Sequence, residues 1–271
     1  MAPPLFPAFA TLATRLERGV LFVTLNRPEV RNAMSLLMVE ELSKALAAAQ
    51  DSSAVRVVVL RGAGGHFCAG ADLKDMAAAR TRPAEPGRDG VAAVNARFGE
   101  LCAAFARSPL ALVAVLEGTV MGGGFGLACV ADVALASESV SFRLPETSLG
   151  VVPAQIAPYL VERIGYAQAK RLAVTGSRVD AAAALAMGLV HEVHAGDRLD
   201  AALAMVLGAI LACAPGAIAA TKALVAKSRF TPPADLVAEA AAVFSRAVQS
   251  AEGREGTAAF VEKRKPNWVP Q

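Results

Sequence analysis

The fold is decided by the stretch Gly118-Thr119-Val120-Met121-Gly122-Gly123-Gly124-Phe125-Gly126-Leu127-Ala128-Cys129-Val130-Ala131-Asp132, which lies between apolar runs at 110–116 and 133–136. This order predicts a strand, a glycine turn and a buried helix. Three consecutive glycines let the backbone approach a ligand closely, and the first turn of the following helix presents N–H groups that have no intrahelical partner. The stretch therefore predicts an anion pocket lined by backbone amides.

Three interpretations of this pocket were compared. A phosphate cradle is disfavoured, because the Gly-Lys-Ser/Thr ending of a P-loop is missing and the spacing does not give Gly-x-Gly-x-x-Gly followed by an acidic residue. The amides could instead hold an oxyanion that develops on a carbonyl oxygen. A glycine-rich helix start can also serve close packing alone, and this stretch by itself does not decide between the last two interpretations.

The composition indicates a globular protein with a large core. Of the 271 residues, 55% are hydrophobic, enough for one large domain or for a core domain with a smaller appendage. There is no run of about eighteen apolar residues and no signal-peptide pattern at the start, so we expect a cytoplasmic location without membrane contact. The net charge is only +3, and Lys and Arg are dispersed, so nucleic-acid binding is not expected.

The cysteines and histidines do not indicate a metal or redox site. The four cysteines lack CxxC spacing and lie in apolar surroundings, which predicts reduced, buried thiols: Cys68, Cys102, Cys129 and Cys213. His191 and His194 would point to opposite faces of a strand, so we interpret them as structural or surface residues. His66 lies near Cys68, but the neighbouring apolar residues favour a packed loop over a thiol–base pair.

Apolar periodicity elsewhere predicts a parallel α/β arrangement. A β-hairpin around Gly19, a helix capped by Ser35, a buried strand and a further helix precede the glycine stretch, the last two at 55–60 and 91–107. Strands follow it at 132–136, 140–144 and 189–193. The remaining pattern is helical, at 159–164, 166–174, 181–187, 199–212, 217–227 and 235–250. The composition of residues 75–90 indicates a mobile flap near a pocket.

Glu146 is the strongest candidate for proton transfer. It directly follows Pro145 at the end of a predicted strand, next to apolar Leu144 and Leu149. Partial desolvation there would raise the pKa of its carboxyl toward neutral pH, where a general acid or base works best. A surface glutamate that caps a turn remains the alternative at this point.

Four motifs occur in the order and spacing of the crotonase superfamily, namely Asn26-Arg27-Pro28…Asn32-Ala33, Cys68-Ala69-Gly70-Ala71-Asp72-Leu73-Lys74, Gly122-Gly123-Gly124 and Pro145-Glu146. The chain resembles an enoyl-CoA hydratase/isomerase over roughly residues 12–268, including the tail Ala259-Phe260-Val261-Glu262-Lys263-Arg264-Lys265-Pro266. The resemblance implies a spiral of ββα repeats, with an α/β core at 1–200. It also implies a C-terminal helical region at 201–271 that assembles the chain into a homotrimer or homohexamer.

The resemblance also implies a site. The thioester carbonyl would accept hydrogen bonds from the backbone N–H groups of Ala71 and Gly123, and Glu146 would be catalytic. Coenzyme A would lie along residues of the first two motifs and of the tail, namely Arg27, Ala33, Ala69, Asp72, Leu73, Lys74, Phe260 and Lys263. The substrate would be an acyl-CoA, and neither a metal nor another cofactor is expected.

Position 126 departs from the family pattern. Hydratases of the fatty-acid type carry a glutamate there, whereas this chain has Gly126. One carboxylate can move a proton between two carbons, which is the logic of a Δ3–Δ2-enoyl-CoA isomerase. The segment 144–159, with Ala154-Gln155 after Pro153, resembles bacterial hydratases of branched or glutaconyl-type enoyl-CoA. We therefore rank hydration of such a substrate first and isomerisation second. An RNA-binding relative comes third, because no lysine-rich helix face is found.

Overall fold

The computed structural model describes residues 6–81 and 89–270, with only the backbone of residues 79–81. A six-stranded sheet forms its centre, in the order β1 (Leu12–Glu17), β2 (Val20–Leu25), β3 (Val57–Gly62), β4 (Ala111–Leu116), β6 (Val133–Ser137) and β9 (Glu192–His194). The β1–β2 hairpin is antiparallel and every other pair in this sheet is parallel. The predicted hairpin and the predicted parallel α/β class are both confirmed.

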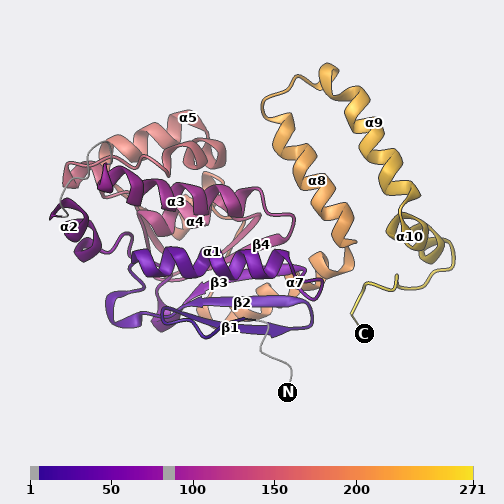
Figure 1. Cartoon of the computed structure of the whole chain (residues 1–271), viewed down its shortest axis with the longest axis horizontal. Coiled ribbons are helices and arrows are strands. Elements are labelled where there is room, and N and C mark those ends of the chain that lie inside the picture. The colour runs from indigo at the N-terminus through magenta and orange to yellow at the C-terminus, as the bar shows by residue number, and fades with distance from the viewer. Residues whose placement is uncertain (1–5, 82–88, 271) are drawn as a thin grey trace.

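Both faces of this sheet are buried, which explains the continuous apolar runs of its strands. Alternate side chains point to opposite faces, so Val58 and Leu60 of β3 join one core whereas Val57 and Val59 join the other. Helices α1 (Leu36–Gln50) and α3 (Gly90–Ala106) contribute side chains to the first core, and α7 (Leu199–Ala212) covers the second face (Figure 1).

A second sheet gives the chain its repeating pattern. It contains β5 (Thr119–Met121), β7 (Ser141–Arg143) and β8 (Arg178–Asp180), and two isolated bridges, Met34 with Ala71 and Cys68 with Val120, extend the same arrangement. Strands β2, β3, β4 and β6 are each followed by one of these short pairings and then by a helix. The chain is thus built from repeated units of a long strand, a short strand and a helix.

The helices begin and end where the sequence allows. Ser35 caps α1 by accepting a hydrogen bond from the N–H of Met38 at 3.2 Å, as predicted. The two helices predicted at 159–164 and 166–174 form one element, α5 (Ala157–Thr175), which is broken at Gly165, where φ is 76°. The other short helices are α2 (Leu73–Thr81), α4 (Gly123–Val130), α6 (Ala181–Ala186), η1 (Pro28–Val30), η2 (Ala63–Gly65), η3 (Glu146–Leu149) and η4 (Gly196–Arg198).

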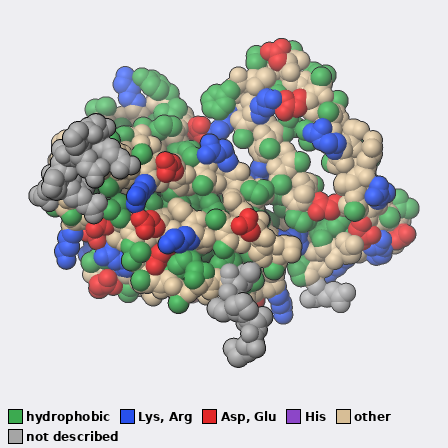
Figure 2. Space-filling model, in the orientation of Figure 1, with side chains coloured by type: hydrophobic (Ala, Val, Ile, Leu, Met, Phe, Trp, Pro, Cys, Tyr) green, Lys and Arg blue, Asp and Glu red, His purple; other side chains and the backbone are tan. Residues whose placement is uncertain are grey.

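The last helices, α8 (Pro215–Ser228), α9 (Pro233–Gln249) and α10 (Ala251–Val261), project from the core as an arm (Figure 1). Arg56 ties the end of this arm to the core, because its guanidinium donates to the carbonyl oxygens of Trp268 at 2.6 Å and Leu211 at 3.0 Å. Hydrophobic side chains remain on the arm surface among the charged ones (Figure 2), including Phe230, Phe244 and Phe260. Such exposed apolar side chains are typical of an assembly surface.

Several expectations need correction. The strand predicted at 189–193 begins later, at Glu192, because Leu189 and Val190 are buried in the turn that follows α6. Helix α2 occupies the first part of the predicted flap at 75–90, and residues 82–88 of that flap lie outside the described residues. Strand β8 and helix α10 were not predicted. Cys213 is exposed, whereas Cys68, Cys102 and Cys129 are buried and free, as expected.

Helix α7 straddles the predicted boundary at residue 200 and packs on the sheet, so the projecting arm begins only at Pro215. Within residues 6–81 and 89–270, no single helix is long and apolar enough to cross a membrane. The two segments Gly196–Ala212 and Pro215–Ser228 meet a length and composition criterion only together, and they are bent by 97° from each other.

Candidate active site

The three consecutive glycines have three different roles in the backbone. Gly122 has φ 47° and ψ −120°, a conformation that a residue with a Cβ rarely adopts. Gly123 is the first residue of α4. A Cβ on Gly124 would lie 2.6 Å from the Cβ of Cys68, so this glycine is needed for close packing. Packing therefore accounts for Gly124 but leaves Gly122 and Gly123 free for another role.

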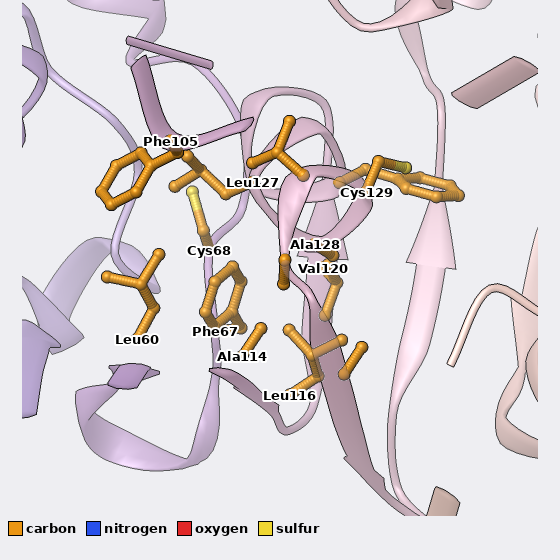
Figure 3. Close-up of a cluster of buried hydrophobic side chains, with 14 of the residues drawn as sticks. Leu60, Phe67, Cys68, Phe105, Ala114, Leu116, Val120, Leu127, Ala128 and Cys129 are labelled. Atoms are coloured by element: carbon orange, nitrogen blue, oxygen red, sulfur yellow. The ribbon is translucent and has the colours of Figure 1, made fainter. Parts of the chain in front are cut away.

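A dense apolar cluster supports this turn (Figure 3). Phe67 and Cys68 lie between Leu60 of β3 and the α4 side chains Leu127 and Ala128, and all five are fully buried. Burial raises the pKa of the Cys68 thiol to about 11, so the group stays protonated and unreactive at neutral pH. Such close packing holds the first turn of α4 in a fixed position.

The carboxylate of Glu146 and the amide of Ala71 converge on one side of Gly122. A Cβ placed on Gly122 would lie 3.1 Å from Glu146 Oε1, 3.3 Å from the Cα of Gly70 and 3.9 Å from the backbone nitrogen of Ala71. The backbone nitrogen of Gly123 is the next along the chain. One small volume therefore has a carboxylate and two backbone amides around it.

Both amides are available to a ligand. At the bridge between Met34 and Ala71, the N–H of Met34 donates to Gly70 and the N–H of Asp72 donates to Met34, at 2.7 and 2.9 Å. Among the hydrogen bonds of the described residues, none uses the N–H of Ala71 or of Gly123. Gly123 lies in the first turn of α4, whose N–H groups have no intrahelical acceptor and carry the positive end of the helix dipole.

Glu146 begins the 3-10 helix η3 directly after Pro145. Burial raises the pKa of its carboxyl, and a hydrogen bond with its own backbone opposes this only in part. Its Oε2 atom is buried and has no hydrogen-bond partner within the described chain. A carboxylate that is partly desolvated and has a free oxygen is suited to accept and return a proton. These features set Glu146 apart from a surface residue that only caps a turn.

An apolar wall occupies the space around position 126. A Cβ on Gly126 would lie 3.1 Å from Phe98 Cζ and 3.3 Å from Ile156 Cγ1. The same phenyl ring is 3.4 Å from the position of a Cβ on Gly123, and Met34 Sδ is 3.5 Å from it. The structure therefore places an aromatic ring where the two-glutamate relatives would carry a carboxylate side chain.

Most of the residues expected along coenzyme A lie together near this volume. Arg27 donates to the carbonyl oxygen of Ala33 at 2.7 Å and to Asp72 Oδ2 at 2.9 Å. Burial acts to raise the pKa of Asp72, but hydrogen bonds from the N–H of Lys74 and from Arg27 hold it below its usual value. The N–H of Ala69 donates to the carbonyl oxygen of Arg31, and Leu73 is 66% exposed.

Phe260 and Lys263 are not brought to this site within one chain. Phe260 belongs to α10 and Lys263 follows it, at the far end of the arm, whereas α2 lies at the opposite end of the molecule (Figure 1). The Phe260 side chain is 86% exposed. These two residues could therefore contact a ligand only in a different subunit.

The histidines and buried asparagine are structural. His66 Nδ1 accepts a hydrogen bond from the N–H of Thr119 at 3.1 Å, and His191 Nδ1 accepts one from Ala134 at 2.9 Å. Asn32 is fully buried and donates to the carbonyl oxygens of Ala63 and His66, which ties the first motif to the loop of the second. Among the described residues, no group of three His, Cys, Asp or Glu could hold a metal ion.

Sequence reasoning missed the wall residues Met34, Phe98 and Ile156. Each is an apolar residue in a segment with an ordinary helical or loop pattern, so its spacing gives no sign of a contact with α4. Only the glycine at position 126 gave a signal, because a residue without a side chain in a buried helix implies that another group fills the space.

Comparisons with known proteins agree with this geometry. Residues 15–271 match the family model described as enoyl-CoA hydratase/isomerase. Over 93% of this chain and 96% of the relative, the sequence is 31% identical to a 2,3-dehydroadipyl-CoA hydratase of Escherichia coli. Two solved structures superpose closely. An enoyl-CoA hydratase/isomerase from Marinobacter aquaeolei is 47% identical with a TM-score of 0.93, covering 96% of this chain and 99% of that one. AtuE of Pseudomonas aeruginosa is 52% identical with a TM-score of 0.92, covering 96% and 100%.

Proposed function

Because the chain belongs to the enoyl-CoA hydratase/isomerase family, we propose that this enzyme reversibly hydrates a branched or glutaconyl-type 2-enoyl-CoA through a thioester enolate. The crotonase-like α/β fold with C-terminal helices, expected from the four motifs, is confirmed by the structural neighbours. The observation that carries the proposal is the convergence of Glu146 Oε1 and the Ala71 amide beside Gly122.

In the proposed reaction, the thioester carbonyl accepts hydrogen bonds from the N–H groups of Ala71 and Gly123. These donors stabilise the negative charge that collects on this oxygen when water adds to the β-carbon. Because both are backbone groups held by close packing, they need little reorganisation during the reaction. Losing one such donor typically lowers kcat by about 100- to 1000-fold.

Glu146 handles both protons of the hydration. Its carboxylate accepts a proton from the attacking water as the oxygen bonds to the β-carbon, and the same carboxyl then donates a proton to the α-carbon of the enolate. The raised pKa favours this cycle, because a carboxyl that binds a proton near neutral pH can also release it there. The free Oε2 atom provides a second oxygen for the water.

The substrate class is supported by two observations. The segment 144–159 resembles hydratases of branched or glutaconyl-type esters, and the similar E. coli enzyme is named for an enoyl-CoA that carries a second carboxyl group. The absence of a side chain at Gly126 accommodates a wall of Phe98 and Ile156, which would face the acyl chain. We place the acyl group between this wall and Glu146.

We further propose that coenzyme A binds along Arg27, Ala33, Ala69, Asp72, Leu73 and Lys74, and that no other cofactor takes part. Phe260 and Lys263 would complete the site of a neighbouring subunit in a homotrimer or homohexamer, because their own site is too far away. The core at 1–200 would then perform catalysis and the region 201–271 assembly, in a cytoplasmic enzyme.

A Δ3–Δ2-enoyl-CoA isomerase is the second candidate, because position 126 lacks a carboxylate. Glu146 would then remove a proton from one carbon of the acyl chain and return it to another across the same enolate. Incubation with 2-enoyl-CoA and 3-enoyl-CoA esters separates the two candidates. Loss of the absorbance of the conjugated thioester indicates hydration of a 2-enoyl ester, and its appearance from a 3-enoyl ester indicates isomerisation. Isomerisation without hydration would overturn the first proposal.

A further inference from the structure

Two side-chain amides meet close to the wall over position 126. Gln155 Nε2 donates a hydrogen bond to Asn95 Oδ1 at 2.9 Å and thereby joins helix α3 to the segment that precedes α5. Gly99 makes this contact possible, because a Cβ on that residue would lie 2.1 Å from Gln155 Oε1. The two amides are therefore held by a hydrogen bond and by the lack of a side chain beneath one of them.

This amide pair lies at the rim of the proposed acyl pocket. Asn95 is three residues before Phe98 on α3, a spacing that places both on the same helix face. Gln155 directly precedes Ile156. Phe98 and Ile156 are the two side chains that meet at Gly126, so each amide adjoins one half of the wall.

The pair still has polar groups available for a ligand. Among the hydrogen bonds of the described residues, none uses Asn95 Nδ2 or Gln155 Oε1. Asn95 is exposed and Gln155 is partly exposed, so a bound molecule can reach them. The nearby cation Arg97 is paired with Glu40 at 2.7 Å, which leaves the neutral amides as the uncommitted donors on this part of α3.

We propose that Asn95 and Gln155 form a specificity site for a carboxylate on the acyl chain of the substrate. This inference rests on the proposed function, which places the α-carbon at Glu146 and the β-carbon toward Gly126. Substituents beyond the β-carbon then pass Phe98 and Ile156 and reach the amides. The N–H groups would bind the carboxylate oxygens, whereas an alkyl end of the same length would leave these donors without a partner.

The test measures binding by calorimetry with two saturated ligands, glutaryl-CoA and valeryl-CoA, which have equally long acyl chains with and without a carboxylate. The wild-type protein should bind glutaryl-CoA about tenfold or more tightly, the scale of one hydrogen bond to a charged group. Gln155→Leu and Asn95→Leu should each remove most of this preference by weakening glutaryl-CoA alone. The control Gln168→Leu removes an exposed amide from α5 and should change neither affinity.

A second route moves Gln155 without removing its amide. Gly99→Ala should displace this side chain and weaken glutaryl-CoA, while leaving valeryl-CoA unchanged. The proposal is overturned if the wild type shows no preference, if the preference survives in both leucine variants, or if they weaken both ligands equally. The last result would show that the amides only join α3 to α5.

Because neither ligand can be hydrated, this test is independent of the reaction. A wild-type protein that prefers glutaryl-CoA but does not hydrate glutaconyl-CoA would contradict the proposed function and support the carboxylate site. Hydration of glutaconyl-CoA and pent-2-enoyl-CoA with equal kcat/KM, together with equal binding of the two saturated ligands, would overturn the carboxylate site alone.

Discussion

Replacing Gly122 with alanine tests whether its backbone conformation serves the site. At φ 47° and ψ −120°, a residue with a Cβ carries strain of about 1–3 kcal/mol. For 271 residues, an unfolding entropy of about 2.1 cal/mol/K per residue gives about 0.6 kcal/mol/K, so this strain should lower Tm by about 2–5 °C.

The same methyl group should also lower activity. It would lie 3.1 Å from Glu146 Oε1, which is too close for an undisturbed carboxylate, and it would enter the volume beside the Ala71 amide. We expect kcat for enoyl-CoA hydration to fall by about 10- to 100-fold, the scale of a displacement of about 1 Å in a catalytic geometry. Steady-state kinetics beside a thermal melt measure both effects.

Gly188→Ala is the matched control. Gly188 has φ 76°, and a Cβ there would have no atom within 4 Å, so the variant carries backbone strain of about 1–2 kcal/mol without a steric contact. It should lower Tm and leave kcat unchanged. If Gly122→Ala is folded and fully active, or if the control loses as much activity as Gly122→Ala, the assignment of this volume to catalysis is wrong.

Three other predictions follow from particular contacts. Burial raises the pKa of Glu146 above its unfolded value of 4.5, so the wild type loses stability as pH rises from this value through the folded pKa; Glu146→Gln should therefore melt at a higher temperature than the wild type at neutral pH, and the difference should vanish below pH 4.5 in melts across pH. Gly126→Glu should lower Tm because its Cβ meets Phe98 at 3.1 Å, and adding Phe98→Ala should recover part of that loss and add hydration of crotonyl-CoA; a double variant no more stable than the single one would contradict the steric account. Arg56→Met should release the C-terminal tail, so the emission of Trp268, the single tryptophan, should shift to longer wavelength, and an unchanged spectrum would show that other contacts hold the tail.

The strands and the glycine turn were predictable because their signals are local. The continuous apolar run of β3 indicates burial on both faces, and the glycine triplet indicates a close backbone approach whatever the rest of the fold. The short strand β8 and the start of β9 were not predictable, because three residues are too few for a period. Their pairing depends on neighbours that come from elsewhere in the chain.

The site was predictable in its motifs and unpredictable in its walls. Glu146 stands out because a carboxylate follows a proline at a buried strand end. Phe98 and Gln155 do not, because their contacts with Gly126 and Gly99 join segments more than 25 residues apart in sequence. The projecting arm was also beyond prediction from periodicity, since α8 to α10 have the helical pattern of a core without packing on one.

The central claim is that one carboxylate, Glu146, performs the proton transfers of the reaction. Its most direct test is hydration of glutaconyl-CoA by Glu146→Gln, followed through the absorbance of the conjugated thioester. The amide has nearly the same shape but cannot cycle a proton, so kcat should fall by at least about 100-fold, while calorimetry shows unchanged binding of glutaryl-CoA. A folded Glu146→Gln protein with full activity would contradict the claim.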